Sequence, residues 1–496
     1  MGLSELYRGS HTEYDNDTAF VVAPTLLMGA LITVAFISQF IFRGSPAVAI
    51  AGIAIATAGY FALILWKGML VEGAFGAMLV TSTFGADIPL ASRGYIQTMP
   101  RAIGPQLFLF ELFLCALIFA IIAQQRDLTV PVSKPTWLFF GLIVWCFLAT
   151  AVVRPARMDT ALFFNFWLVI GFLVFVVSSI TVWSTRLRLE TIFKILGVAV
   201  GGHTLVAFLQ FANQQPFGMT VMGENALRTT ATVPVATYQV QLGVYLQGFT
   251  GFGYNLAGLH VLLLPVVIAL AAATGQIHRK IVLYATAVIQ ILFVFMTWNH
   301  AGIGAAVVAV FTLVVLQDIS RTPQKLQNFK RTVTLAFIGI GTVFALTLQK
   351  PIVGAVLTPV INTLDIRLTQ YVTAIIIAIQ QPLFGVGPAN FYYLAVEYGL
   401  PRPIVVDNVY LELLATTGII GMVLFISFVV SITRQVGFCG VQTNHTYLLP
   451  VGAGLVGFMG LAFWEVLPLF QPTLFIPWMT LLGVIAHDAS EVVAPK

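Results

Sequence analysis

The chain has 496 residues, of which 59% are hydrophobic and only 9% are charged. Soluble domains carry about a quarter charged residues, so this composition excludes an ordinary soluble protein and indicates an integral membrane protein. The net charge of +5 is no sign of nucleic-acid binding, because the basic residues lie at the ends of apolar runs. The three cysteines show no metal-ligand or redox spacing.

Apolar runs of membrane-spanning length recur along the chain. A helix needs about 20 apolar residues to cross the hydrocarbon core, and runs of this length favour helices over a barrel. We therefore predict an all-α polytopic protein with about 12–14 transmembrane helices. No internal repeat or soluble domain is evident, so residues 1–496 are expected to form a single integral membrane domain. Residues 68–84 are apolar but interrupted, and hydropathy leaves open whether they form a further span or a re-entrant piece. The expected spans are 19–42, 46–66, 104–125, 135–153, 160–183, 190–212, 254–275, 281–298, 302–317, 332–349, 408–431, 446–463 and 473–487.

Basic residues in the short loops predict the topology. Placing His278–Lys280, Arg321–Arg331 and Arg434 inside puts the segments 214–253 and 350–407 on the outer face. Loops longer than about 15 residues are usually functional or disordered, and the aromatic and apolar residues in these two argue against disorder. We expect both outer loops to form the functional site, and the second to be partly helical.

Arg367 opens an apolar helix that we expect over about 366–381, with Tyr371 one turn further on. An arginine in this position commonly reaches lipid phosphates. Its guanidinium also matches a diphosphate bidentately, which makes it a candidate for binding an anionic substrate.

A glycine-containing turn, Pro382-Leu-Phe-Gly385-Val-Gly387, follows this helix. Gly385 and Gly387 allow a positive φ or close approach of a ligand to the backbone. A Gly-x-Gly pattern is most often only a tight turn, and no strand precedes it, so a dinucleotide site is excluded.

Asp407 and Asn408 lead directly into the 408–431 span. Both residue types are good helix N-caps, and capping alone would account for them. Glu412 lies one turn further, on the same helix face as Asn408. A carboxylate inside a membrane is costly unless it is paired or functional, so the two acids are also candidates for a general base.

In this order the motifs resemble the O-antigen ligase/polymerase superfamily of GT-C-like integral membrane glycosyltransferases. The resemblance covers about residues 250–430 and rests on Arg367, the Pro382–Gly387 turn, Asn408-Val-Tyr-Leu and Gly418-Ile-Ile-Gly421. The upstream segment GFTGFGYNLAGLHVLLLP is also similar to a family segment, with Asn255 in register.

The chain departs from the family pattern at three places. The family's histidine before the asparagine is Asp407 here, the arginine expected near 245 is absent, and Asn299-His300-Ala301-Gly302 replaces a Ser-Arg-Gly sequence. The missing histidine favours a glycan polymerase over a lipopolysaccharide ligase. It leaves Asp407, Glu412 and His300 as alternative general bases.

What the resemblance implies is transfer of a polyprenyl-diphosphate-linked glycan to a sugar hydroxyl, at the outer (periplasmic) face of the inner membrane. The reaction would be inverting and need no cofactor, and its most fitting form is polymerisation of O-antigen or exopolysaccharide repeat units. No carboxylate pair with metal-ligand spacing is seen, so no metal requirement is expected. The partners implied are the lipid-linked glycan donor, a glycan acceptor, membrane lipid and a chain-length-regulating membrane protein, with no nucleic acid. The residues implied are Arg367 for the diphosphate, Arg228 or Arg402 as a second cation, Asp407, Glu412 or His300 as base, and Asn408, Gly385, Gly387, Tyr371 and Asn255 around the substrate.

Alternative functions remain open at this point. One is an O-antigen ligase acting onto lipid A-core, and another is a protein O-oligosaccharyltransferase. A lipid-linked oligosaccharide flippase belongs to a different class. Transporter folds usually show two related halves with broken helices at mid-depth. No half-repeat is visible here and the polar residues gather on one face, which favours the enzyme.

Overall fold

The computed structural model describes the chain in segments. These are residues 16–42, 45–85, 87–89, 106–124, 133–185, 187, 189–214, 216–217, 224, 232–235, 238–241, 246–250, 253–297, 299–319, 351–400, 403–443 and 448–493. The expected span 332–349 lies outside them, as do Arg228 and Arg402.

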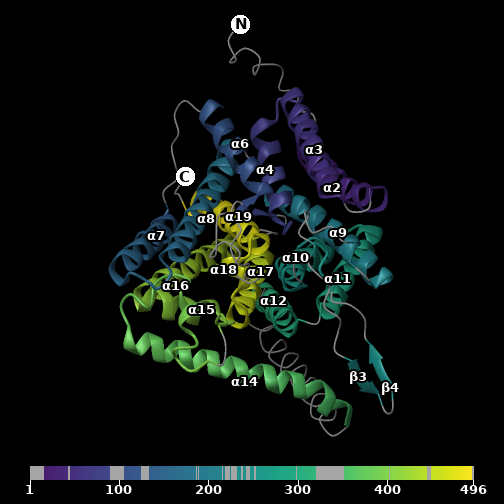
Figure 1. The fold of residues 1–496 in the computed structure, drawn as a ribbon. Helices are drawn as coiled ribbons and strands as arrows, with labels where there is room; N and C mark the ends of the chain where they lie inside the picture. Colours follow the sequence, from purple (N-terminus) through teal and green to yellow (C-terminus); the bar gives the residue numbers. More distant parts are fainter. Residues whose placement is uncertain are drawn as a thin grey trace.

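Helices make up almost all of the described chain (Figure 1). In chain order they are α2 (Asn16–Phe40), α3 (Pro46–Trp66), α4 (Leu70–Ser82), α6 (Leu109–Gln124), α7 (Lys134–Val153), α8 (Met158–Thr185), α9 (Leu189–Asn213), α10 (Gly253–Ala273), α11 (Ile277–Met296), α12 (His300–Ile319), α14 (Pro351–Gln380), α15 (Phe391–Leu394), α16 (Val409–Thr443), α17 (Leu448–Trp464), α18 (Leu467–Phe470) and α19 (Pro472–Val493). Every expected span within the described residues coincides with one of these helices.

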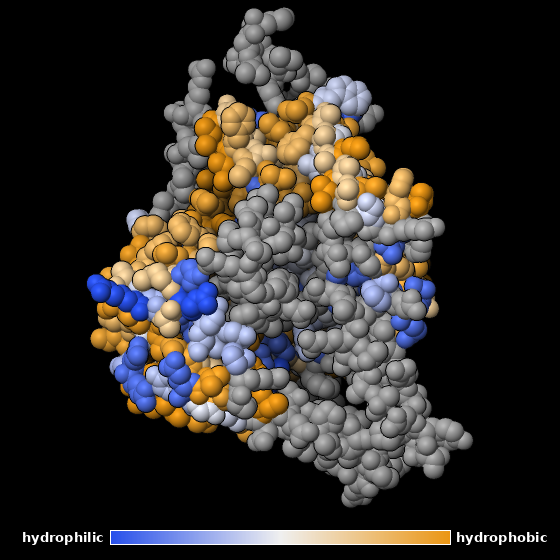
Figure 2. Space-filling view, viewed as in Figure 1, coloured by the Kyte–Doolittle hydropathy of each residue, from blue (hydrophilic) through white to orange (hydrophobic). Residues whose placement is uncertain are grey.

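The polytopic all-α class is confirmed. Within the described ranges, 8 helices are long and apolar enough to cross a membrane, namely α2, α3, α7, α8, α9, α10, α11 and α16. The other expected spans within the described ranges correspond to the shorter apolar helices α6, α12, α17 and α19. Large apolar side chains are exposed along these helices, and hydrophobic residues cover much of the described surface (Figure 2). Such a surface fits lipid, whose chains are as apolar as the side chains that meet them.

Residues 68–84 form a short interior helix. α4 has 13 residues, and nearly all of them from Val71 to Ser82 are buried. At 1.5 Å per residue it is about 20 Å long, well short of a hydrocarbon core of about 30 Å. Its apolar composition therefore reflects contact with neighbouring helices, chiefly α6, α2 and α9.

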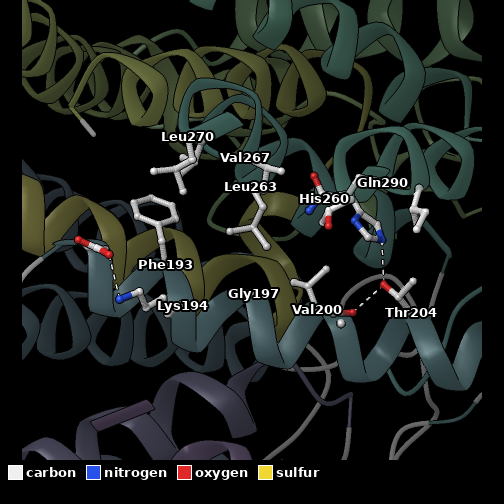
Figure 3. A pocket seen from close by; sticks show the side chains of 15 residues that line it. Phe193, Lys194, Gly197, Val200, Thr204, His260, Leu263, Val267, Leu270 and Gln290 are labelled. Atoms are coloured by element: carbon white, nitrogen blue, oxygen red, sulfur yellow. Dashed lines mark hydrogen bonds and ion pairs between the residues drawn. The ribbon is translucent and has the colours of Figure 1, made fainter. Parts of the chain in front are cut away.

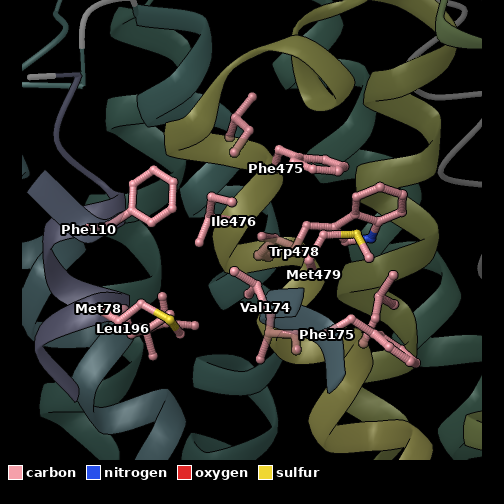
Figure 4. Packing of buried hydrophobic residues seen from close by; sticks show 14 of the residues in the cluster. Met78, Phe110, Val174, Phe175, Leu196, Phe475, Ile476, Trp478 and Met479 are labelled. Carbon is pink, nitrogen blue, oxygen red and sulfur yellow. The ribbon is translucent and has the colours of Figure 1, made fainter. Parts of the chain in front are cut away.

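The packed centre of the molecule lies where α4, α8, α9 and α19 meet (Figure 4). Met78, Phe175, Phe475 and Trp478 are all buried there. Gly483 permits this packing, because a Cβ at that position would overlap the backbone of Phe175. Close contact between α8 and α19 fixes the C-terminal helices against the first half of the chain.

The two long loops contain structure that sets their place. The 214–253 segment contributes the antiparallel strands β3 (Thr232–Val235) and β4 (Tyr238–Gln241), and β1 (Asp87–Pro89) pairs with β2 (Gln106–Phe108) elsewhere. These short hairpins were not expected. The helix expected over 366–381 is the second half of the 30-residue α14, so this loop is partly helical as predicted. β3 contacts α14, and both lie at one end of the helical bundle, as Figure 1 shows.

Candidate active site

Arg367 lies between two carboxylates. Its Nη2 donates to Glu465 Oε1 at 2.9 Å, and its Nε lies 3.9 Å from Asp407 Oδ2. The side chains of Arg367, Asp407 and Glu465 are 15%, 26% and 7% exposed. They come from α14, from the residues before α16, and from the residue after α17, so three distant parts of the chain meet on one guanidinium.

One cation between two largely buried acids makes the site electrostatically unbalanced. Burial, and next the charge of Asp407, raise the pKa of Glu465 to about 8, with Arg367 acting against the rise. Burial also raises the pKa of Asp407, while Arg367 and Gln370 act to lower it. Two acids this close titrate as a pair, because the second charge is repelled by the first. The pair therefore retains a proton near neutral pH, and the cluster can both accept and donate one.

α14 holds the segment that carries Asp407. Arg367, Gln370 and Tyr371 share one face of the helix, at spacings of three and four residues. The Asp407 backbone N–H donates to Gln370 Oε1 at 3.3 Å, and the Tyr371 hydroxyl donates to the Asp407 carbonyl at 3.1 Å. The backbone around Asp407 is thus fixed from the same helix face that presents Arg367.

Asn408 is the N-cap of α16, a role for which the sequence offered both Asp407 and Asn408. Its Oδ1 accepts the Leu411 N–H at 3.0 Å, and its carbonyl accepts the Glu412 N–H at 2.9 Å. Since Asn408 satisfies the first turn of α16, the side chain of Asp407 is left to face Arg367.

Glu412 is a third acid beside this cluster. It is 1% exposed, and neither of its carboxylate oxygens has a partner with hydrogen-bond geometry among the described residues. Asp407 and the Val406 amide act on it electrostatically. An unpaired buried carboxyl is unusual unless it is protonated or meets a substrate.

Positive φ angles and close packing against the protein explain the two glycines of the Pro382–Gly387 turn. Gly385 and Gly387 have φ values of +64° and +94°. A Cβ on Gly385 would lie 2.5 Å from the Ala415 carbonyl, and one on Gly387 would lie 2.5 Å from Pro155 Cβ. The turn fits into a break in α16 at Gly418, where Ile419 N–H donates to the Pro382 carbonyl at 2.8 Å. The protein itself thus packs closely against both glycines. Contact of these glycines with a ligand stays a prediction.

The remaining candidates lie apart from this cluster or outside the described residues. Asn255 is buried in α10, where its Nδ2 donates to the Thr250 carbonyl at 2.7 Å, and none of its described contacts reaches Arg367. His300 begins α12, but its side chain is not among those described. Within the described ranges, no group of three or more His, Cys, Asp or Glu could hold a metal ion.

Glu465 is the site residue that sequence reasoning missed. It follows the expected span 446–463 and is the only Asp, Glu, Lys or Arg between residues 446 and 487. An isolated acid between two apolar runs is a functional signal in a membrane protein. The sequence contained this signal, but the partner of Glu465 is Arg367 in α14, which is distant in sequence.

Comparison with known proteins identifies a family over part of the chain. Residues 264–426 match a family model described as O-antigen ligase. The matched part runs from α10 into α16 and includes Arg367, Asp407 and Glu412, whereas Glu465 lies beyond it. No curated protein matches the chain.

Proposed function

We propose, from the premise that residues 264–426 of this chain form an O-antigen ligase domain, that the protein transfers a glycan from a polyprenyl-diphosphate carrier to a sugar hydroxyl. Polysaccharide transfer of this general kind is what the family carries out. The observation that supports a particular site is the guanidinium of Arg367 held between Asp407 and Glu465.

The chemistry of glycan transfer suits this cluster. The bond between the anomeric carbon and the diphosphate breaks with its electron pair, so negative charge grows on the leaving oxygen and needs a positioned cation. Arg367 supplies that cation. The acceptor hydroxyl forms the new bond to the anomeric carbon and gives its proton to a carboxylate, for which Asp407 is the best placed. Attack on the face opposite the diphosphate inverts the anomeric centre.

Glu465 is a positioning residue in this proposal. It orients the guanidinium through the 2.9 Å bond, and it competes with the diphosphate for the same donors. A proton retained by the acid pair weakens that competition, because a neutral carboxyl binds a guanidinium less strongly than a carboxylate. Donor binding and the protonation of the pair are therefore coupled.

The reaction we propose first is polymerisation of surface-polysaccharide repeat units, with the site at the outer face of the plasma membrane. Support comes from the family resemblance and from Asp407, which stands where ligases of the family carry a histidine. Ligation onto lipid A-core or protein, and flipping of the lipid-linked glycan, are the competing reactions.

The test compares Arg367→Ala and Asp407→Asn with the unaltered full chain in cells that make the lipid-linked repeat unit. We expect a loss of long glycan chains on the order of 10²–10³-fold, with single repeat units accumulating on the lipid carrier. Arg157→Ala is a matched control, since Arg157 is partly exposed and paired with Asp159. Long chains that form normally but remain on the carrier would identify a ligase instead. Normal products in both variants would exclude this site, and translocation without any new glycosidic bond would exclude an enzyme.

A further inference from the structure

A membrane groove lies between α9, α10 and α11, apart from the Arg367 cluster (Figure 3). Its volume is about 290 Å³, room for roughly ten groups the size of a water molecule. Most of its wall is apolar, including Phe193 and Val200 from α9, Leu263 and Leu270 from α10, and Ile289 from α11.

The α9 wall is open because it carries glycines. Gly197 and Gly201 lie one turn apart along the groove, and a Cβ built on either meets nothing within 4 Å. Glycines four residues apart in a membrane helix usually allow a second helix to approach closely. Here no described helix takes that space, so the two glycines leave a slender channel along α9.

The polar end of the groove has unpaired hydrogen-bond acceptors. The Thr204 hydroxyl gives its single proton to the Val200 carbonyl at 2.7 Å, so at its 3.2 Å contact with His260 it accepts from Nε2–H. This leaves Nδ1 of a neutral His260 as a bare acceptor, and Nδ1 has no partner among the described residues. Gln290 Oε1, in the same wall, has none either. His260 is 1% and Gln290 6% exposed, so both are buried and line the groove.

The other end of the groove has its charges paired. Lys194 Nζ lies 2.9 Å from Glu190 Oε1 at that end. An anionic headgroup there would have to compete with Glu190, and a plain hydrocarbon would leave both acceptors at the His260 end unpaired. The groove therefore selects for an apolar chain whose hydrogen-bond donor lies beside His260 and Gln290.

We propose that this groove binds a hydroxyl-bearing lipid, such as a long-chain alcohol or prenol, with its chain along Gly197 and Gly201. The hydroxyl donates to His260 Nδ1 and accepts from the Gln290 amide, which can turn to present either its oxygen or its nitrogen. In this arrangement the hydroxyl proton pairs His260 Nδ1, and Gln290 presents an amide N–H to the hydroxyl oxygen in place of its unpaired Oε1. The site is separate from the Arg367 cluster and does not depend on the proposed function.

The test measures binding of radiolabelled farnesol and of its methyl ether, which lacks the donor, to the purified full chain in nanodiscs. We expect farnesol to bind about tenfold more tightly than the ether, as expected for one desolvated hydrogen bond. His260→Leu should bring the two affinities to within about twofold of each other, whereas Gln290→Met should weaken both by a similar factor, because alcohol and ether both accept from its amide. Gln290→Met keeps the shape of the side chain, so unchanged binding of both probes to this variant would count against the site even if His260→Leu does not fold.

Substitutions that fill the channel provide a second, independent test. Gly197→Leu and Gly201→Leu should abolish binding of both probes without loss of folded protein, because each new side chain enters open space. Gly304→Leu is the matched control, since Gly304 in α12 also has open space around it, and it should leave both affinities unchanged. Equal binding of alcohol and ether to the unaltered chain would overturn the proposal, as would farnesol binding that survives Gly197→Leu.

Discussion

At the scale of single residues, the central feature is one guanidinium that serves two carboxylates. Arg367 donates directly to Glu465 and faces Asp407 at a longer distance. A planar guanidinium can hold two anions at once, which the compact ammonium of a lysine cannot do with the same geometry. The arginine thus holds two acids near one cation, and in the proposed reaction the same cation meets the anionic substrate.

This arrangement has a consequence for pH dependence. Near neutral pH the acid pair holds a proton, because burial raises the pKa of Glu465 to about 8 and also raises that of Asp407. Asp407 can accept a proton only when it is ionised, and burial raises its pKa, so the rate of transfer should rise with pH on the acidic limb. The folded chain binds the proton more tightly than the unfolded chain, so the corresponding stability is lost as pH rises through about 8.

We expect Glu465→Gln to move the acidic limb of the pH–rate profile to lower pH, by roughly one unit. The substitution removes a carboxyl that competes for Arg367, whose charge lowers the pKa of Asp407, and it keeps the size of the side chain. The measurement is the initial rate of glycan transfer against pH for the full chain, with kcat and KM separated. Glu397→Gln, at an exposed position, is the control and should leave the profile unchanged. A limb that stays in place or moves to higher pH would contradict the coupling.

At the scale of elements, the break in α16 positions the start of that helix. Gly418 has φ +72°, and its backbone meets the Pro382–Gly387 turn, while the Trp145 indole N–H donates to the Thr417 carbonyl at 2.9 Å. Phe384 stacks on Trp145 with ring centroids 4.8 Å apart. α7, the turn and α16 therefore pack together at the break, which follows the segment of α16 that begins beside Asp407 and carries Glu412.

We expect Gly418→Ala to be strongly destabilising. Gly418 has φ +72° and ψ −175°, a region that only glycine normally occupies and that costs another residue about 1–3 kcal/mol, and the added Cβ would also overlap the Leu383 carbonyl. The yield of monodisperse protein and its thermal unfolding midpoint in detergent should both fall. Gly59→Ala in α3, where a Cβ meets nothing within 4 Å, should have little effect. A midpoint for Gly418→Ala equal to that of the unaltered chain would show that the break is not needed.

These elements show what the sequence could and could not predict. Apolar runs are long and regular, so the helices were predicted well, and motif order brought Arg367, Asp407 and Glu412 to one site. The break at Gly418 was not predicted, because Gly-Ile-Ile-Gly continues an apolar run and its φ depends on a turn from another segment. Glu465 was missed for a related reason: its role arises only from contact with Arg367, 98 residues away.

At the scale of the whole molecule, the arrangement brings both long loops to the end where the Arg367 cluster lies. β3 contacts α14, α14 contacts α16, and Glu465 follows the end of α17 at the same place. The turn between α10 and α11, with His278 and Lys280 just inside α11, lies at the other end of α10 from the 214–253 segment. Because basic residues in short loops mark the cytoplasmic side, the cluster should face outward.

Cysteine labelling tests this orientation. In a chain whose Cys115, Cys146 and Cys439 are replaced by alanine, Glu397→Cys at the cluster end and Gln276→Cys between α10 and α11 would each supply one exposed thiol. A membrane-impermeant maleimide applied to intact cells should modify Glu397→Cys and spare Gln276→Cys, and both should react after the membrane is permeabilised. The opposite pattern would place the cluster in the cytoplasm, where a donor would have to be used before it crosses the membrane. Because the proposed polymerisation takes place on repeat units that have already crossed, that pattern would exclude the proposed function along with the orientation.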